Sequence, residues 1–183
     1  MVKVKVISIG DEILIGQIVN TNSAYINEKL HCIGVKVSKV VTIGDNRKDL
    51  FDELNDSIQN NYDITLITGG LGPTHDDITK PILVEFFNDE LVLDEKVLEK
   101  VKSIFANRNV VMPETNIGQA MKPSKSKIIW NEHGTAPGLL IEVQNRIFVA
   151  MPGVPFEMKE MIDHSVVPLI KEKYLQNPNY YYK

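Results

Sequence analysis

The sequence predicts an α/β sandwich, in which helices cover both faces of a mostly parallel sheet. Three strand patterns, at residues 2–9, 35–43 and 64–68, alternate with the patterns of amphipathic helices. Strands that are separated by single helices cannot form tight hairpins, so they must lie parallel with right-handed crossovers. Two later strand patterns, 138–143 and 146–150, are separated by Gln144 and Asn145 alone and predict an antiparallel hairpin near the edge of the sheet.

The first half of the chain supplies the parallel strands and their crossover helices. Residues 2–9 begin with strict alternation and become fully apolar, which is typical of a strand that enters a core. Asn22 or Ser23 is the expected cap of a first helix that stops at Gly34. After the second strand, another helix is expected from about Arg47, and it leads to the third strand.

In the second half of the chain, strand and helix patterns no longer alternate regularly. Ile78, Ile82 and Phe86 predict a helix with Pro81 in its first turn, where the missing N–H is tolerated. Asp94 is expected to cap the next helix.

The end of the chain closes the fold. Residues 128–130 form a short strand candidate, and a last helix over 154–170 must bend or break near Pro168. We therefore expect one domain over residues 1–170, followed by a tail or the start of a linker over 171–183.

Composition narrows the function classes. Lys and Arg total 20 against 24 Asp and Glu, and the pI is near 5.6, so no basic surplus favours nucleic acid or an anionic membrane as partner. Cys32 is the only cysteine, and no apolar run approaches the length that spans a bilayer. These features predict a cytoplasmic protein with a small-molecule ligand.

A glycine-rich turn follows the third strand. Residues 69–80 read GGLGPTHDDITK and lie between a parallel strand and a helix, where ligands bind in open α/β sheets. Gly69, Gly70 and Gly72 allow backbone N–H groups to face outward, and the following helix N-terminus adds partial positive charge. The turn is therefore a candidate phosphate cradle.

Asp76 and Asp77 suggest that a metal accompanies the phosphate. Two carboxylates repel a phosphate unless a divalent cation lies between them, and these oxygen ligands suit Mg²⁺, Mn²⁺ or Co²⁺. The alternative is that Asp77 or Thr79 caps the next helix while Asp76 is solvated, and for an isolated Asp-Asp pair capping is the more common role.

The other parallel strands also end in glycine followed by acid. The first strand leads into Gly10, Asp11 and Glu12, and the second leads into Gly44 and Asp45. The predicted topology gathers these acids with Asp76 and Asp77 at one rim, and a chain usually tolerates such repulsion only to hold a metal or a cationic ligand. Each acid taken singly could equally be a turn residue.

The segment MPGVP, residues 151–155, ends the last strand. Pro152 and Gly153 form a rigid turn that is either purely structural or a second binding edge for phosphate or substrate, and both interpretations stay open. His75 is the only histidine in the candidate site and is expected to be a hydrogen-bonding neighbour.

Four blocks carry a resemblance to a known family. They resemble the amino-terminal domain of CinA, the competence/damage-inducible family, which has the MogA/MoaB-like molybdopterin-binding fold. In chain order the blocks are GDEILIGQIVNTNSAYINEKL (10–30), TGGLGPTHDDITK (68–80), GTAPG (134–138) and MPGVPFEMK (151–159). The resemblance implies a three-layer α/β/α sandwich, the same fold class that the strand and helix patterns predict.

The resemblance also implies an activity. CinA-type proteins are associated with a divalent-metal-dependent pyrophosphatase that hydrolyses ADP-ribose to AMP and ribose 5-phosphate. The alternatives are a molybdopterin adenylyltransferase-like enzyme and a non-catalytic nucleotide- or pterin-binding module. Fold kinship alone cannot choose among them. Related domains form dimers or trimers, so a homo-oligomer is expected.

Residue by residue, the family pattern assigns roles to the acids. Asp77 matches the acidic position of the glycine-rich loop as metal ligand or catalytic carboxylate. Asp45 matches the second essential acid, which implies that it shares the metal ion or orients the attacking water. Asp76 stands where many adenylylating relatives carry another residue, which favours the CinA branch. Asp11 and Glu12 match the amino-terminal motif, where purine or ribose contact is as plausible as metal binding.

Further positions are implied as substrate contacts. The residues expected to hold phosphates or other polar groups of the substrate are Gly69, Gly70, Gly72, Thr74, Asn20 and Asn22. Pro81 departs from the family pattern, which commonly continues TKE, so the turn after Thr79 is expected to be tighter. Deamidation of nicotinamide mononucleotide belongs to a further carboxy-terminal domain of the family and is not expected here.

Overall fold

The structure is a computed structural model that describes residues 2–74 and 77–175. A six-stranded sheet forms its centre, with the strand order β2-β1-β3-β8-β7-β6. The strands are β1 (Val4–Ile9), β2 (Val37–Ile43), β3 (Ile64–Thr68), β6 (Lys127–Ile129), β7 (Gly138–Val143) and β8 (Arg146–Met151). Strands β2, β1, β3 and β8 are parallel, whereas β7 runs antiparallel to β8 and to β6. The predicted mostly parallel sheet with an antiparallel hairpin near its edge is confirmed.

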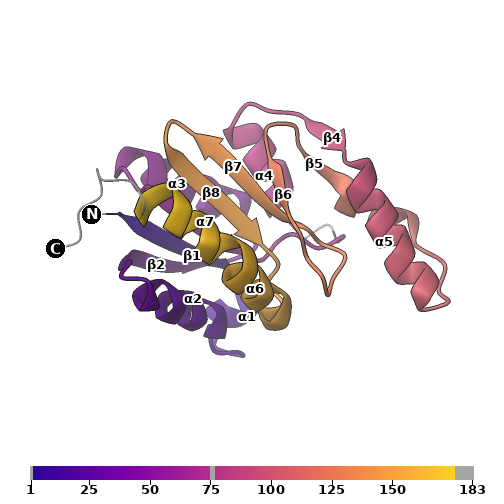
Figure 1. The fold of residues 1–183 in the computed structure, drawn as a ribbon, viewed down its shortest axis with the longest axis horizontal. Helices are drawn as coiled ribbons and strands as arrows, with labels where there is room; N and C mark the ends of the chain where they lie inside the picture. The colour runs from indigo at the N-terminus through magenta and orange to yellow at the C-terminus, as the bar shows by residue number, and fades with distance from the viewer. Residues whose placement is uncertain (1, 75–76, 176–183) are drawn as a thin grey trace.

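Helices cover both faces of this sheet, as Figure 1 shows. One face carries α2 (Thr21–Cys32) and a long closing rod, and the other carries α3 (Arg47–Gln59) and α4 (Thr79–Phe86). Each face of the sheet has its own apolar core, because β1, β3 and β8 direct buried side chains to both sides. The predicted α/β/α sandwich is therefore confirmed.

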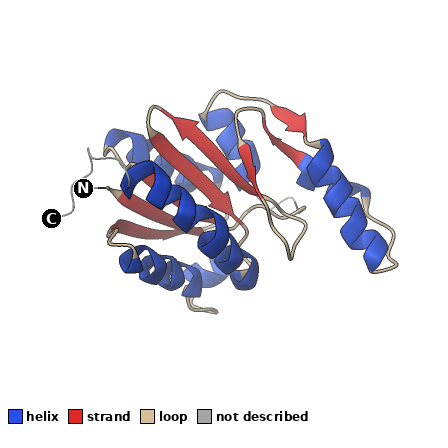
Figure 2. Ribbon diagram, in the orientation of Figure 1, coloured by secondary structure: helices blue, strands red, loops and turns tan. Residues whose placement is uncertain are grey.

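A smaller unit projects from the β6 side of the sheet (Figure 2). The strands β4 (Leu91–Leu93) and β5 (Met121–Pro123) pair antiparallel in a sheet of their own. Between them lie α5 (Glu95–Asn107) and the 3₁₀ helix η1 (Glu114–Ala120), which share a small apolar cluster. Asp94 Oδ1 accepts a hydrogen bond from Val97 N at 3.1 Å, so the predicted cap of α5 is confirmed.

The cap of α2 differs from the expectation. Asn20 Oδ1 accepts a hydrogen bond from Ser23 N at 3.0 Å, so Asn20 is the N-cap, and the helix begins before the expected Asn22 or Ser23. Asn22 and Ser23 are instead buried in the first turn. A single-turn helix α1 (Asp11–Leu14) precedes this segment.

The closing rod continues past Pro168 to Leu175. It consists of α6 (Pro155–Met161), the π-helical turn η2 (Ile162–Val166), α7 (Val167–Ile170) and the π-helical turn η3 (Lys171–Leu175). Wider π turns accommodate a proline, which lacks an N–H and clashes with the carbonyl four residues earlier. The last helix therefore changes type on either side of Pro168 and does not break there.

The rod also moves the carboxyl-terminal boundary of the domain. Tyr174 is 1% exposed, packs in the core, and donates its hydroxyl to the carbonyls of Asp63 and Asn145 at 3.0 and 2.9 Å. The folded unit thus includes residues beyond the expected boundary at 170. None of the helices in the described ranges is long and apolar enough to cross a membrane.

Candidate functional site

A cavity of about 400 Å³ lies at the carboxyl ends of the parallel strands. That volume is within the range of about 300–1,000 Å³ that is typical of small-molecule sites. The loops after β1, β2, β3 and β8 line it, together with the loop that precedes β7. The predicted residues that line the cavity are Glu12, Asp45, Gly69, Gly70, Gly72, Asp77, Pro152 and Gly153. Asp76, predicted as a metal ligand, lies outside the described residues.

The glycine turn is forced into shape by close packing. Gly69 has φ +107°, and a Cβ there would lie 2.5 Å from the Ile9 carbonyl oxygen at the end of β1. Gly70 has φ +65°, and its Cβ would lie 2.4 Å from Thr79 Oγ1. Thr79 Oγ1 donates to the Gly69 carbonyl at 2.8 Å, and so ties the start of α4 to the turn. Only glycine fits at these two positions.

Asp77 organises the loop that follows. Its Oδ1 accepts from Gly72 N at 2.6 Å, and its Oδ2 accepts from Thr74 N at 2.7 Å and from the Thr74 hydroxyl. The N–H groups of Gly72 and Thr74, expected to face a phosphate, therefore point to Asp77. Asp77 does not cap α4, whose N-cap is Ile78 without a side-chain bond. Because a carboxylate has about four acceptor sites and three are used here, one remains for a metal ion or another donor.

Asp11 and Asp45 join the ends of β1 and β2. Asp11 N donates to Asp45 Oδ2 at 3.2 Å, and Asp45 N is 3.4 Å from Asp11 Oδ1. A Cβ on Gly44 would lie 2.5 Å from Asp11 Oδ1, so the glycine makes room for that carboxylate. Asp45 lines the cavity, whereas Asp11 supports it from outside.

The carboxylates on the cavity wall are the candidate ligands of the expected divalent metal. Within the described ranges, no group of three or more His, Cys, Asp or Glu side chains is arranged to hold a metal ion. Mg²⁺ is usually held by one or two carboxylates together with water and substrate phosphates, so Asp45 and Asp77 fit that mode. Among the described lining residues there is no lysine, arginine or histidine to balance Glu12, Asp45 and Asp77.

Lys80, to which the sequence analysis gave no role, lies just beyond the loop. Its side chain is largely buried, and Nζ donates to the Gly118 carbonyl of η1 at 2.8 Å. Burial lowers the pKa of Lys80 to about 8, against the opposing attraction of the Asp77 carboxylate. Lys80 thus connects the glycine-rich loop to the projecting unit.

Glu157 is a second residue that the sequence analysis missed. It lies within the MPGVPFEMK block and lines the cavity from α6. Asn131 Nδ2 donates to Glu157 Oε2 at 2.7 Å. The MPGVPFEMK block could have pointed to Glu157, because the residue lies within it. The spacing of residues in the block does not show that Asn131 holds this carboxylate.

A side pocket of about 110 Å³ adjoins the main cavity at Ile9, Glu12 and Gly153. Asn20 and Asn22, both predicted as substrate contacts, line this pocket rather than the main cavity. Asn20 caps α2 and donates from Nδ2 to Thr42 Oγ1 at 3.2 Å. Asn22 Nδ2 donates to the Gly153 carbonyl at 2.8 Å. Its Oδ1 is buried and has no hydrogen-bond partner in the described structure.

Residues 5–172 match the model of a protein family described as probable molybdopterin binding domain. The chain belongs to this family. It is 43% identical over 173 residues to a CinA-like protein of Flavobacterium psychrophilum, covering 94% of this chain and 41% of that protein. A CinA-like protein of Chloroherpeton thalassium is 42% identical over 171 residues, covering 91% of this chain and 40% of the relative. The chain thus spans about two fifths of the length of the curated relatives that it matches.

Solved structures support the same placement of this molybdopterin-binding-family domain. The CinA protein of Thermoplasma acidophilum, whose function is described as unknown, superposes with a TM-score of 0.79 at 29% identity, covering 93% of this chain and 96% of that one. The molybdopterin biosynthesis enzyme MoaB of Thermus thermophilus gives a TM-score of 0.62 at 18% identity, covering 94% and 93%. The second likeness shows the fold alone. The predicted resemblance to CinA and to the MogA/MoaB-like fold is confirmed.

Proposed function

We propose that this domain is a divalent-metal-dependent pyrophosphatase that hydrolyses ADP-ribose to AMP and ribose 5-phosphate. The observation that carries the proposal is the gathering of three carboxylates, Glu12, Asp45 and Asp77, on the wall of a cavity that also holds a glycine turn. Carboxylates gathered beside a candidate phosphate site favour a ligand that is accompanied by a divalent cation. The resemblance to CinA-type proteins supplies the substrate.

The chain's own residues would divide the work. Asp77 keeps the loop of Gly72 and Thr74 in one conformation, and this prepares the diphosphate site before substrate arrives. Asp45 and Asp77 would hold the metal, which supplies charge neutralisation and a more acidic water when bound. Hydrolysis forms one bond from a water oxygen to phosphorus and breaks the bridging P–O bond, and a carboxylate oxygen of Asp45, which lines the cavity, would take the water proton.

The experiment is chromatography of ADP-ribose incubated with the protein and Mg²⁺, Mn²⁺ or Co²⁺, with an EDTA control. We expect AMP and ribose 5-phosphate with metal and neither with EDTA. Asp77→Asn should lower turnover by at least roughly a hundredfold, because even residues that only orient a metal ligand cost 10–100-fold when replaced. Full activity of Asp77→Asn, or unchanged ADP-ribose with every metal, would contradict the assignment.

The family description favours one alternative, in which the cavity takes a pterin. A molybdopterin adenylyltransferase-like enzyme would consume ATP only when molybdopterin is added, and a binding module would bind nucleotide or pterin without turnover. The same chromatography with ATP and molybdopterin separates these outcomes. We also propose a homo-oligomer, a dimer or trimer, which a light-scattering mass equal to one chain would overturn.

A further inference from the structure

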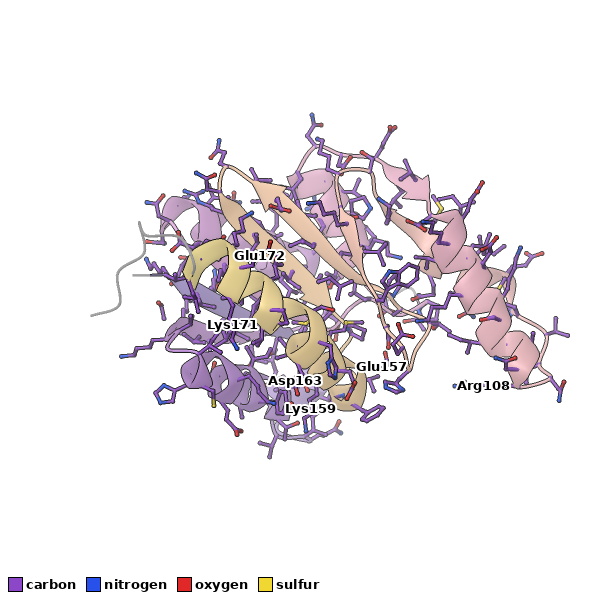
Figure 3. The ribbon with its side chains drawn as sticks, in the orientation of Figure 1. Arg108, Glu157, Lys159, Asp163, Lys171 and Glu172 are labelled. Carbon is purple, nitrogen blue, oxygen red and sulfur yellow. The ribbon has the colours of Figure 1, made fainter. Side chains whose placement is uncertain are left out.

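The hydrolysis proposed above assigns no role to Glu157. Glu157 is half-buried near the start of α6 and lines the main cavity. Figure 3 shows it at the end of the closing rod, beside the loop that joins β6 to β7. Two of the sequence blocks therefore meet at this residue, MPGVPFEMK on the rod and GTAPG in the loop, although the hydrolysis as described above uses no residue of either block.

A dedicated network fixes the position of Glu157. Asn131 is 4% exposed and donates from Nδ2 to Glu157 Oε2 at 2.7 Å and to the Ala136 carbonyl at 2.9 Å. Its Oδ1 accepts from the backbone N–H groups of His133 and Gly134 at 3.0 and 2.9 Å. Because both ends of the Asn131 amide are occupied, its orientation is determined, and an amide N–H can only point to an acceptor.

The loop is also shaped around this carboxylate. A Cβ on Gly134 would lie 2.4 Å from Glu157 Cδ, so the loop approaches closely only because residue 134 is glycine. A surface glutamate that served solubility alone would have no need of such a close fit. The network holds one carboxylate oxygen and leaves Oε1 with no hydrogen-bond partner in the described structure.

The location of Glu157 indicates which part of a ligand it meets. Glu157, Thr135 and Ala136 line the main cavity and not the side pocket, which adjoins the cavity at Ile9, Glu12 and Gly153. The walls of the side pocket include the apolar residues Ile13, Ile18, Val19 and Pro155. A flat nucleobase suits apolar walls. With the base there and the phosphates at the glycine turn, the far end of the ligand would lie in the part of the main cavity that Glu157 lines.

The chemistry of a carboxylate selects the group at that far end. A carboxylate accepts hydrogen bonds and repels phosphate, so the group that it meets is a neutral donor. In dinucleotide-binding folds the hydroxyls of a ribose are read by a carboxylate in the same way. Charge-assisted bonds of this kind are about twice as strong as neutral ones.

We propose that Glu157 is a specificity-determining residue that accepts hydrogen bonds from the hydroxyls of the terminal sugar of a nucleoside diphosphate sugar, with Asn131 as its positioning residue. The identity of the substrate class rests on the proposed function. The domain would then distinguish a diphosphate that carries a sugar from one that does not.

The test compares two ligands that resist hydrolysis. Calorimetry with Mg²⁺ measures the affinity for α,β-methylene ADP-ribose and for α,β-methylene ADP, which lacks the terminal sugar. We expect the wild type to bind the first more tightly. Glu157→Gln should weaken that binding by about tenfold, within the cost of losing one charge-assisted bond, and leave α,β-methylene ADP within about twofold. Glu160→Gln, one turn further along the rod and outside the cavity lining, should change neither affinity.

A second variant guards against a simple effect on folding. Gly134→Ala retains the Glu157 carboxylate but displaces it through the close contact described above, so it should reproduce the selective loss. Equal weakening of both ligands by Glu157→Gln, or no weakening of either, would overturn the inference. The selective loss in a protein that never cleaves ADP-ribose would sustain the inference while contradicting the hydrolase.

Discussion

Two groups of charged side chains in this domain differ in the signs of the charges that they contain. The first lies between the sheet and α3, where Lys5 of β1 has no exposed surface and places Nζ 2.6 Å from Glu53 Oε2 and 2.6 Å from Asp56 Oδ2. Lys39 of β2 adds a second cation, at 3.0 and 3.1 Å from the same two carboxylates. Two cations thus meet two anions, and the charges of this group cancel.

The second group lines the cavity, and the charged side chains among its described members are all acidic. Glu12, Asp45, Asp77 and Glu157 share its wall, and the described lining contains no basic side chain. Asp77 and Glu157 are held by amide and hydroxyl donors, which stabilise a carboxylate without neutralising it.

This difference relates the charge composition of each group to its role, in folding for the first group and in ligand binding for the second. A balanced group completes its interactions within the chain, so the removal of one partner costs stability. Carboxylates gathered on a cavity wall can interact in addition with a ligand and its metal. We therefore expect substitutions in the first group to change stability and substitutions in the second to change activity.

The largest expected effect uses a matched pair of aspartates. Asp89 accepts from the backbone N–H groups of Glu90 and Lys125 and from the Ser124 hydroxyl, much as Asp77 accepts from two N–H groups and a hydroxyl, but it lies outside the cavity lining. Asp77→Asn should reduce ADP-ribose turnover by at least roughly a hundredfold. Asp89→Asn should keep turnover within about twofold of wild type while it lowers the melting temperature to a similar extent as Asp77→Asn.

Initial rates and thermal unfolding of both variants decide this prediction. If the two asparagine variants lose stability alike but neither loses activity, holding the loop is the whole role of Asp77. The assignment of Asp77 to the metal and the phosphates would then be wrong.

The strands of the main sheet could be predicted from the sequence because the pattern that marks a strand lies within a few consecutive residues. Residues 64–68 and the hairpin at 138–151 are buried apolar runs with turns at their ends, and hydrophobic periodicity reads such runs directly. The pair β4 and β5 was missed because each strand has three residues, and Leu91 and Leu93 are 41% and 46% exposed. Strands of three residues are too short to carry a periodic signal, and the exposed leucines of β4 do not read as part of a core.

The site was predictable in its location and not in its contacts. Asp45 and Asp77 follow strand ends, and parallel topology brings such ends together. That Asp77 occupies the N–H groups of Gly72 and Thr74 depends on the conformation of one turn, which residue types alone do not determine. Glu157 was missed because its partner Asn131 is 26 residues away, and a single sequence does not record that pairing.

The next effect tests the balanced group through its buried cation. Lys5→Met removes one cation and leaves Glu53 and Asp56 facing Lys39 alone. We expect a loss of about 2 kcal/mol, below the 3–5 kcal/mol of a fully buried pair because the two carboxylates keep contact with water. Urea denaturation should show this loss of stability, while ADP-ribose turnover stays within about twofold of the wild type.

The control is Lys48→Met, which breaks the exposed pair with Asp52 and should unfold like the wild type. An unchanged stability of Lys5→Met would show that the group does not contribute to folding.

The smallest effect is a change in the acid sensitivity of the balanced group. The hydrogen bond from Lys5 lowers the pKa of Asp56 to about 2 against the opposing effect of burial, and Lys39 adds to the lowering. Because the folded pKa lies below the ordinary value of 3.8, the stabilisation is complete above about pH 4 and is lost as the pH falls towards 2. Asp56→Asn has no carboxyl to protonate, so its urea midpoint should fall less steeply than that of the wild type between pH 4 and 2. Parallel curves for the two proteins would mean that Lys5 and Lys39 do not hold Asp56 in its charged form, and the contrast between the two groups would then rest on the cavity alone.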